Sequence, residues 1–570
     1  MGVVTRRVCR NQRGSVLPLT LIAVLLFSVL GFTLVAMGTT ELTISGSWKQ
    51  YSAAFYGAEA GIESGIVALR AILATTSTPT TTQLAGITAP SLADPKLSFA
   101  AFSVTRVVPT PPYSYATTFS TGPYASFSGQ VTDYLITSEV RGDNGTRSRQ
   151  TQIFRHVQVP LFQFGAFYGA GVDLEISPGP SMTFNGRVHA NSNIYVGAGS
   201  TLTFGSSMTS AGTIQRQVKR SSDIPWGNDP LIMDGNGNYQ PLNFDHSYRP
   251  GFSSTWAASA WQAQANSVFG NNVRDSAMGV GQIVPPVPDL FYNPSNPDVV
   301  AHQLIEAPGP SDSPALLAAK MYSQAGLRIV DGVAADMSNS PVSLAPGVIT
   351  TASFYDAREA RMMSVVQIDV GLLRASGGAP ANGVMYVANT TPGAAVRLVN
   401  GAQLPSQGLS VVTQNPAYIQ GDYNTVNKVP AAVLADAVTV LSNQWASNNS
   451  DTKGAMLTSA RPASPTTVNA ALALGPSGES TLSNGGNGQL ENDIRFLEDW
   501  NNQTFTYQGS IVNLWHSQQA QGPWMCCGSG GGQYYTAPTR VWSYDTLFNA
   551  VPPPGTPLGV LMLRGPWTQK

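Results

Sequence analysis

Residues 14–40 form one uncharged and mostly apolar run of 27 residues. About 20 apolar residues are enough to cross a bilayer as a helix. Four arginines precede the run, and Glu41 is the first charged residue after it. Because cytoplasmic flanks carry the excess of Lys and Arg, the pattern predicts a single-pass helix with its N-terminus in the cytoplasm and the remaining chain outside. A cleaved secretory signal is the alternative, since Ala36-Met37-Gly38 offers small residues at a possible cut, although signal h-regions span only roughly 7–15 residues.

The pattern becomes amphipathic after residue 40. Apolar side chains then recur at three- and four-residue steps, which predicts one stripe along a helix. Proline is absent from residues 19–78, so a single helix over residues 15–74 is predicted, about 90 Å long. The stripe consists of Trp48, Tyr51, Phe55, Ala58, Ile62, Ile66, Leu69 and Leu73.

A second helix face carries small residues at strict four-residue spacing, namely Ala53, Gly57, Gly61 and Gly65. Each glycine costs a helix about 1 kcal/mol relative to alanine. A row of them indicates the close approach of another backbone, as in small-xxx-small packing. The partner is either a neighbouring subunit or the chain's own folded domain.

The basic leader, Gly14, the apolar run and Ala58-Glu59-Ala60-Gly61 together resemble the N-terminus of PilX-type minor pilins of type IV pili, over residues 6–75. The resemblance implies cleavage by a prepilin peptidase between Gly14 and Ser15. It also implies insertion into the bacterial inner membrane, followed by packing with other pilins and the pilus assembly machinery. The implied assembly-helix residues are Leu19, Trp48, Tyr51, Phe55, Gly57, Glu59, Gly61, Ile62 and Gly65.

Leu19 occupies the fifth position after the implied cut, where most pilins carry a glutamate that pairs with the amine of a neighbouring subunit. A buried carboxylate is tolerated only when it has a partner. A subunit at the top of a filament has no neighbour above it whose amine could pair with that carboxylate. Leu19 therefore favours a position at the tip or in priming, from which a periplasmic or extracellular body would project.

Beyond residue 75 the pattern is that of short strands. Apolar pairs recur at a fixed 20-residue step over residues 174–214, separated by Gly, Asn and Ser. A single coil of a β-solenoid cannot bury its inner face alone, so successive coils stack on one another. The step predicts parallel β-solenoid coils, with a few short helices elsewhere, and β-sandwich domains are the alternative. Asp143-Asn144-Gly145 between two alternating runs predicts a β-hairpin.

The predicted organisation has seven parts, the last of which holds five of the ten tryptophans and is expected to form a compact core capping the body. These parts are a leader (1–14), the helix (15–74), a linker and β-hairpin region (75–160), solenoid coils (161–220), a mixed region with short helices (221–350), further coils (351–450) and an aromatic-rich C-terminal segment (485–570).

Composition restricts the function further. Charged residues make up only 11% of the chain, and Gly (56) and Pro (40) are abundant, which favours turn-rich β structure outside the cytoplasm. After the leader, the chain carries 27 basic and 32 acidic residues. Nucleic-acid binding needs a basic patch or stripe, so no nucleic-acid partner is predicted.

No catalytic constellation is recognisable, and neither a cofactor nor a metal is predicted. The five histidines form no H-E-x-x-H motif, and there is no G-x-S-x-G elbow or P-loop. His189 lies in a predicted coil with only Arg187 nearby, and a structural role is expected for it. Asp234 and Asp245 have partial calcium-loop spacing, but Tyr239 stands where that loop needs glycine. A non-enzymatic role in assembly is predicted; the alternatives are an uncleaved inner-membrane scaffold and, less favoured, an envelope-tethered carbohydrate-active β-helix enzyme.

Cysteine is scarce, and Cys526 and Cys527 are adjacent in a glycine-rich stretch. Thiols seldom stay free in an oxidising compartment. Neighbouring cysteines can close a strained, reducible ring, or each can pair with another molecule. The two residues are therefore a possible redox pair, with intermolecular pairing left open.

Overall fold

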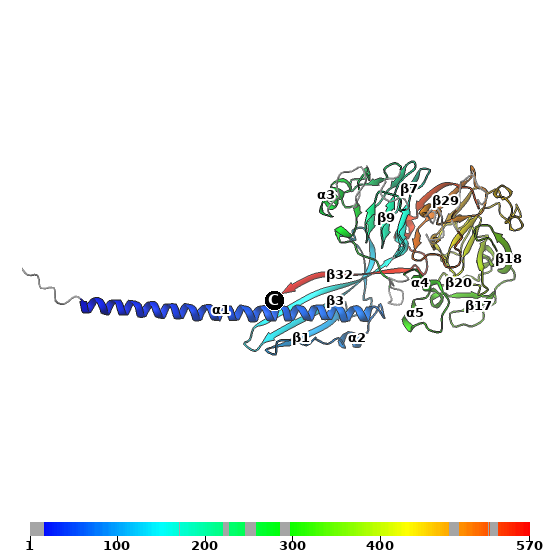
Figure 1. Cartoon of the computed structure of the whole chain (residues 1–570). Coiled ribbons are helices and arrows are strands. Elements are labelled where there is room, and N and C mark those ends of the chain that lie inside the picture. The colour runs from blue at the N-terminus through cyan, green and yellow to red at the C-terminus, as the bar shows by residue number, and fades with distance from the viewer. Residues whose placement is uncertain are drawn as a thin grey trace, which may run out of the picture.

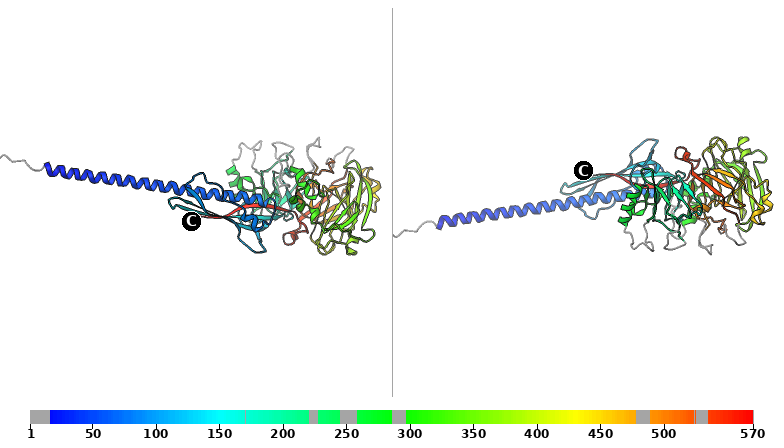
Figure 2. Two further views of the ribbon diagram at one scale, coloured as in Figure 1. Left: turned by 90° about the horizontal axis from the view of Figure 1, so that it is seen from below. Right: turned by 90° about the horizontal axis from the view of Figure 1, so that it is seen from above.

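The computed structural model describes residues 16–169, 171–219, 227–244, 258–285, 297–477, 489–522, 524 and 534–569. A long straight helix carries a small antiparallel sheet near its C-terminal end, and a larger β body lies beyond that sheet (Figure 1). The two further views show the same arrangement, with the helix extending away from the body (Figure 2).

Helix α1 spans Val16–Leu73 without interruption, as the sequence predicts. It ends at Leu73, just before the Thr-rich segment 75–83. Its N-terminal part contains an 18-residue window of mean hydropathy 2.6, none of which is buried. By length and composition it is the one helix in the described part of the chain that could cross a membrane.

The sheet beside α1 has the strand order β1-β3-β4-β32, with β2 paired to β3, and all its pairs are antiparallel. The hairpin predicted around residues 143–145 joins β3 and β4, and Gly145 supplies the positive φ of +85° that the turn requires. The strands are β1 (Leu97–Arg106), β2 (Tyr115–Thr118), β3 (Ser128–Gly142), β4 (Arg147–Pro160) and β32 (Leu558–Gln569).

The C-terminal third of α1 packs on this sheet. The short helix α2 (Thr81–Ala85) closes the same end, with Thr80 forming a capping box with Gln83. Burial on the sheet accounts for the predicted stripe from Ala58 to Leu73, whereas Trp48 and Tyr51 at its start are exposed. The shared core consists of Ile62, Ile66, Leu69, Leu73, Leu84, Ile87, Val104, Tyr134, Ile136 and Phe154.

The body is inserted between two adjacent strands of this sheet. Pro160 at the end of β4 pairs with Leu558 at the start of β32, so residues 161–557 leave and return at one point. This differs from the predicted capping core for residues 485–570, because residues 558–569 leave the body and run back along α1 (Figure 1). Because β4 and β32 lie far apart in the sequence, their pairing produces no local periodic pattern from which it could be predicted.

The first half of the body contains short parallel strands in register, apart from one antiparallel pair, Leu231–Met233 with Tyr239–Pro241. Leu174 pairs with Ile194, Met182 with Leu202, and Val188 with Met208. The 20-residue step is therefore the register of these pairs. The strands are β5 (Ala166–Tyr168), β6 (Leu174–Ile176), β7 (Met182–Phe184), β8 (Val188–Ala190), β9 (Ile194–Val196), β10 (Leu202–Phe204), β11 (Met208–Ser210), β12 (Ile214–Gln215), β13 (Leu231–Met233), β14 (Tyr239–Pro241) and β15 (Val273–Arg274).

The second half repeats this arrangement with looser spacing. Its strands pair in parallel, apart from the antiparallel hairpins β16–β17 and β18–β19. The strands are β16 (Leu327–Val330), β17 (Val333–Asp336), β18 (Ile349–Asp356), β19 (Arg361–Asp369), β20 (Val384–Ala388), β21 (Ala394–Val399), β22 (Leu409–Val412), β23 (Ala417–Gln420), β24 (Ala431–Leu434), β25 (Val438–Leu441), β26 (Thr466–Asn469), β27 (Ala471–Ala473), β28 (Arg495–Phe496), β29 (Thr504–Gly509), β30 (Ile511–Asn513) and β31 (Thr539–Tyr544).

Helices in the body are short, as predicted for a mainly β body. The α-helices are α3 (Ala258–Phe269), α4 (Pro297–His302), α5 (Pro314–Ala319), α6 (Met321–Gln324) and α7 (Val370–Ala375). The 3-10 turns are η1 (Leu161–Gln163), η2 (Ser276–Met278), η4 (Gln303–Ile305), η5 (Ser450–Thr452), η6 (Thr458–Ala460), η8 (Leu490–Asn492) and η9 (Thr546–Asn549).

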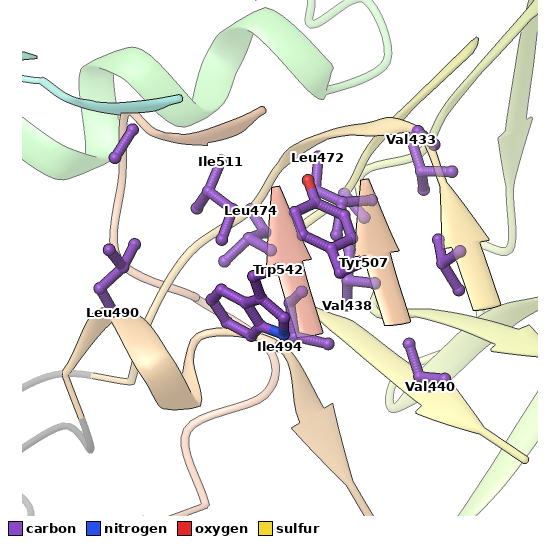
Figure 3. Packing of buried hydrophobic residues seen from close by; sticks show 14 of the residues in the cluster. Val433, Val438, Val440, Leu472, Leu474, Leu490, Ile494, Tyr507, Ile511 and Trp542 are labelled. Atoms are coloured by element: carbon purple, nitrogen blue, oxygen red, sulfur yellow. The ribbon is translucent and has the colours of Figure 1, made fainter. Parts of the chain in front are cut away.

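The two halves share one eleven-stranded sheet, in the order β15-β11-β8-β5-β30-β27-β24-β22-β20-β16-β17. Strand β30 of the second half pairs with β5, the first strand of the first half. We call this junction the seam. Side chains from several sheets fill one interior, where Val433, Leu472, Tyr507, Ile511 and Trp542 lie close together (Figure 3).

Replacing Gly61 by alanine is expected to weaken the contact between α1 and its sheet. An added Cβ would overlap Ser138 and lie 2.8 Å from a ring carbon of Phe99, and overpacking of this kind costs about 1–3 kcal/mol. Urea unfolding of the detergent-solubilised full chain would measure the change. Gly46→Ala is the matched control, because no atom lies within 4 Å of its Cβ position and alanine favours the helix by about 1 kcal/mol. Equal effects at both positions would contradict the packing described here.

Candidate functional site

The N-terminal part of α1 touches nothing else in the described part of the chain. Leu19 is 68% exposed, and its apolar neighbours are similarly uncovered. Burying one such side chain is worth about 1.5–3 kcal/mol, so a row of them in water is strongly unfavourable. This segment therefore needs a bilayer or other helices around it.

The glycine face of α1 packs against the chain's own sheet. A Cβ at Gly57 would meet Val140, and one at Gly65 would meet Ile136. Gly61 lies closest, against Ser138 of β3. The spacing allows either a neighbouring subunit or the chain's own domain to pack on this face. In the structure it is the chain's own domain, because β3 lies in the groove along the three glycines.

The assembly-helix residues implied by the resemblance fall into two groups. Gly57, Gly61, Ile62 and Gly65 are buried against the sheet, so they serve the fold of this subunit. The others remain open to a partner: Leu19, Trp48, Tyr51 and Glu59 are exposed, and Phe55 is half-buried.

The C-terminal strand holds α1 by its side chains. Arg564 Nη1 and Nη2 donate to the two carboxylate oxygens of Glu63 at 2.6 and 2.7 Å. This bond to Arg564 lowers the pKa of Glu63 below its ordinary value. Gln569 Nε2 donates to the Tyr51 hydroxyl at 2.6 Å. Both partners of the Arg564–Glu63 ion pair are about half exposed, so the pair contributes at most about 1 kcal/mol.

The processing residues Gly14 and Ser15 lie outside the described residues, as do Cys526 and Cys527. Their predicted roles therefore remain predictions.

His189 has a structural environment. It is fully buried, with Nδ1 2.8 Å from Thr209 Oγ1 and Nε2 3.1 Å from Asn191 Oδ1. Burial lowers the pKa of His189 to about 4, so the imidazole is neutral at physiological pH. Arg187 bonds to Gln163 rather than to His189. The expected structural role therefore fits this geometry.

Asp234 uses its carboxylate within its own turn. Oδ1 accepts from the backbone N–H groups of Asn236 and Asn238 at 2.8 and 2.9 Å, and Oδ2 accepts from Gln240. Asp245, the other end of the calcium-like spacing, lies outside the described residues. Within the residues the structure describes, no group of three His, Cys, Asp or Glu side chains is placed to hold a metal ion.

Two buried carboxyls at the seam have no signal in the sequence. Asp493 Oδ2 accepts from the Tyr168 hydroxyl of β5 at 2.5 Å and from Asn513 Nδ2 of β30 at 2.6 Å. Burial raises the pKa of Asp493 to about 7 and that of Glu491 to about 8. Only the pairing of β5 with β30 brings Tyr168 and Asn513 together at Asp493. Because both carboxyls are buried in the seam, they do not form the open carboxylate pair that a polysaccharide hydrolase requires.

Comparison with known proteins agrees with the N-terminal resemblance. Residues 13–63 match the family model described as PilX N-terminal, which confirms the resemblance predicted for this part of the chain. None of the curated proteins matches the sequence. A solved structure, that of the competence-associated pilin ComZ from Thermus thermophilus, aligns over 91% of this chain and 97% of its own, with 10% identity and a TM-score of 0.32.

Glu491→Gln is expected to flatten the pH dependence of stability. The folded pKa of Glu491, about 8, lies above the ordinary value of about 4.3, so the fold favours the protonated form. Its stabilising contribution is complete below the ordinary pKa and is lost as pH rises through about 8. The wild type should therefore lose on the order of a few kcal/mol between pH 6 and 9, and the amide variant should lose less.

Thermal unfolding at several pH values would check this expectation. Glu41→Gln on the exposed part of α1 is the matched control and should follow the wild type. Parallel pH profiles for wild type and Glu491→Gln would contradict the expected ionisation.

Proposed function

We propose that this chain is a PilX-like minor pilin that inserts into the bacterial inner membrane and then joins a type IV pilus or a related filament. One observation carries the proposal: α1 is divided into an uncovered apolar part and a part clamped on an antiparallel sheet. The match of residues 13–63 to the PilX N-terminal model supports it. The role is mechanical assembly rather than catalysis.

The proposed sequence of events follows from the polarity of the helix. The uncharged run partitions into the bilayer, with the arginine-rich leader on the cytoplasmic side and the body outside. A prepilin peptidase then cuts between Gly14 and Ser15. The helix leaves the lipid and exchanges it for the helices of neighbouring pilins, so its apolar surface stays covered throughout.

A position at or near the filament tip suits two features. Leu19 stands where most pilins carry the glutamate whose carboxylate pairs with the amine of a neighbouring subunit. The body lies at the end of the molecule opposite to the uncovered helix (Figures 1 and 2), where it would be free to prime assembly or to contact a surface.

We also interpret the body as a parallel β-solenoid made of two half-stacks joined at the seam. The 20-residue register, the parallel pairs and the convergence of several sheets on one core support this interpretation. Stacked coils make a stiff rod, because each coil is held by its neighbours. Such a rod would project the end near β17 and β18 away from the membrane.

Two other functions are alternatives to that of a minor pilin. An uncleaved inner-membrane scaffold would use the same helix as a permanent anchor. A carbohydrate-active enzyme is less favoured, because His189, Asp493 and Glu491 are buried, and His189 and Asp493 are hydrogen-bonded within the fold.

Mass spectrometry of sheared filaments and of membranes would test the proposal. A mature N-terminus at Ser15 in the sheared fraction is expected, and Gly14→Leu should leave the full-length chain in the membrane. Gly31→Ala, an open position on the same helix, is the control and should be processed normally. An intact Met1 confined to membranes would favour the scaffold, and a start at Thr39 in the soluble periplasm would mean that the helix is only a signal.

Immunogold labelling of the body on sheared filaments would test the tip position. Label confined to filament ends is expected, since Leu19 lacks the pairing carboxylate. Label along the whole filament would place the protein in the shaft instead.

A further inference from the structure

The turn that joins β18 to β19 places two arginines beside a pocket. Asp356 shapes this turn, because its Oδ1 accepts from the backbone N–H groups of Arg358 and Glu359 at 2.8 and 3.0 Å. Ala360 has a φ of +52°, a conformation that residues with a Cβ seldom adopt. Backbone outliers of this kind concentrate at functional sites. The turn leads directly into Arg361, the first residue of β19.

The pocket beside this turn has a volume of about 410 Å³ and is open to solvent. That volume lies in the range of sites that bind small molecules. We call it the arginine pocket. Its lining includes Arg358, Arg361, Gln518, Gln521, Gly522 and Tyr534.

A second wall of the arginine pocket is held by one buried carboxylate. Asp436 Oδ1 accepts from the backbone N–H group of Gln518 at 2.6 Å, and Oδ2 accepts from those of Gln519 and Ala520 at 3.1 Å. The Ser517 hydroxyl also donates to Oδ2, at 2.5 Å. The wall is therefore formed before any ligand arrives, which lowers the entropy cost of binding.

The two arginines of the pocket carry positive charge without an ion-pair partner among the described residues. Arg358 is only 4% exposed, and it donates to the Gly522 carbonyl at 3.0 Å and to the Ser477 hydroxyl at 3.1 Å. Arg361 Nη2 donates to the Gln519 carbonyl at 2.8 Å. Burial lowers the pKa of Arg358 to about 10. Buried charges are normally paired, so an anion would complete this site.

Two buried nitrogen atoms of the lining also have no acceptor in the part of the chain that the structure describes. They are Arg361 Nε and Gln518 Nε2. Buried donors are nearly always paired, and an unpaired one indicates a water, an ion or a ligand. Glu359 does not serve them, because its carboxylate accepts from Arg495 Nη1 at 3.0 Å and from the Gly522 N–H at 2.9 Å.

The other groups of the lining suit a hydroxylated ring. The side-chain amides of Gln518 and Gln521 contain both donors and acceptors, as sugar hydroxyls require. Tyr534 is half-buried against the core of the body and adds an aromatic ring to the pocket. Strand β18 lies at the end of the body farthest from the uncovered part of α1 (Figure 1), where an external polymer has access.

We propose that the arginine pocket binds the carboxylate of an acidic sugar residue in an extracellular polysaccharide. A carboxylate accepts two parallel hydrogen bonds from a guanidinium group, so it supplies both the charge and the acceptors that Arg358 and Arg361 require. The chain as a whole does not attract a polyanion, since acidic residues outnumber basic ones after the leader. This inference goes beyond the proposed function, because the binding does not depend on whether α1 enters a filament.

Calorimetric titration of the detergent-solubilised full chain with a galacturonic acid oligosaccharide is the first test. The oligosaccharide should bind, and its methyl ester, which lacks the charge, should not. Arg361→Gln should weaken binding at least tenfold, because a neutral donor replaces the guanidinium group. Arg361→Lys should fall between this variant and the wild type, because lysine keeps the charge without the bidentate geometry. Arg374→Gln, at an exposed arginine of α7, is the matched control and should bind as the wild type does.

Gln518→Met separates binding from folding. Methionine has nearly the same shape but no donor, so affinity should fall at least threefold. The melting temperature should not fall, because Nε2 has no partner in the described fold. A lower melting temperature with unchanged affinity would show that Gln518 is only structural and would overturn its role in the pocket.

Four other results would overturn the inference. They are absence of binding by the wild type, equal affinity for the oligosaccharide and its methyl ester, unchanged affinity of Arg361→Gln, and binding of acetate or inorganic phosphate as tightly as the oligosaccharide. The last result would reduce the pocket to a site for simple anions. None of these results bears on the proposed function, which is tested by the N-terminus found in sheared filaments.

Discussion

Strand β32 pairs with β4 from Leu558↔Pro160 to Gln569↔Gln150, and the arrangement of the whole molecule depends on this pairing. It holds both ends of the inserted body at one point, and it completes the sheet on which α1 lies. The same strand brings Arg564 and Gln569 to the helix. Each aliphatic side chain buried beneath α1 adds about 1.5–3 kcal/mol, so the sheet, the helix and the attachment of the body are stabilised together.

The body contains a second pairing between strands that are far apart in the sequence. Strand β30 returns from the second half to pair with β5 of the first, so the two halves share one continuous sheet. The seam encloses polar groups as well as apolar ones, since Tyr168 and Asn513 come from opposite sides of it to bond Asp493. A buried polar cluster is favourable only when its geometry is kept, which links the fold of the body to this junction.

The division of α1 connects this architecture to function. Its last third is covered by the chain's own sheet, so the glycines at 57, 61 and 65 are occupied within the subunit. Its first part has no cover in the chain and must find it in a membrane or in other helices.

The sequence by itself determined what depends on neighbours along the chain. The apolar run, the continuous helix, the hairpin at Gly145 and the 20-residue register all follow from local periodicity or turn chemistry. Only the tertiary structure decided which sheet the glycine row faces, that residues 558–569 return to β4, and that Asp493 and Glu491 are buried at the seam. These features join segments hundreds of residues apart, and such pairings are set by burial and by matching strand edges, which no spacing in the sequence encodes.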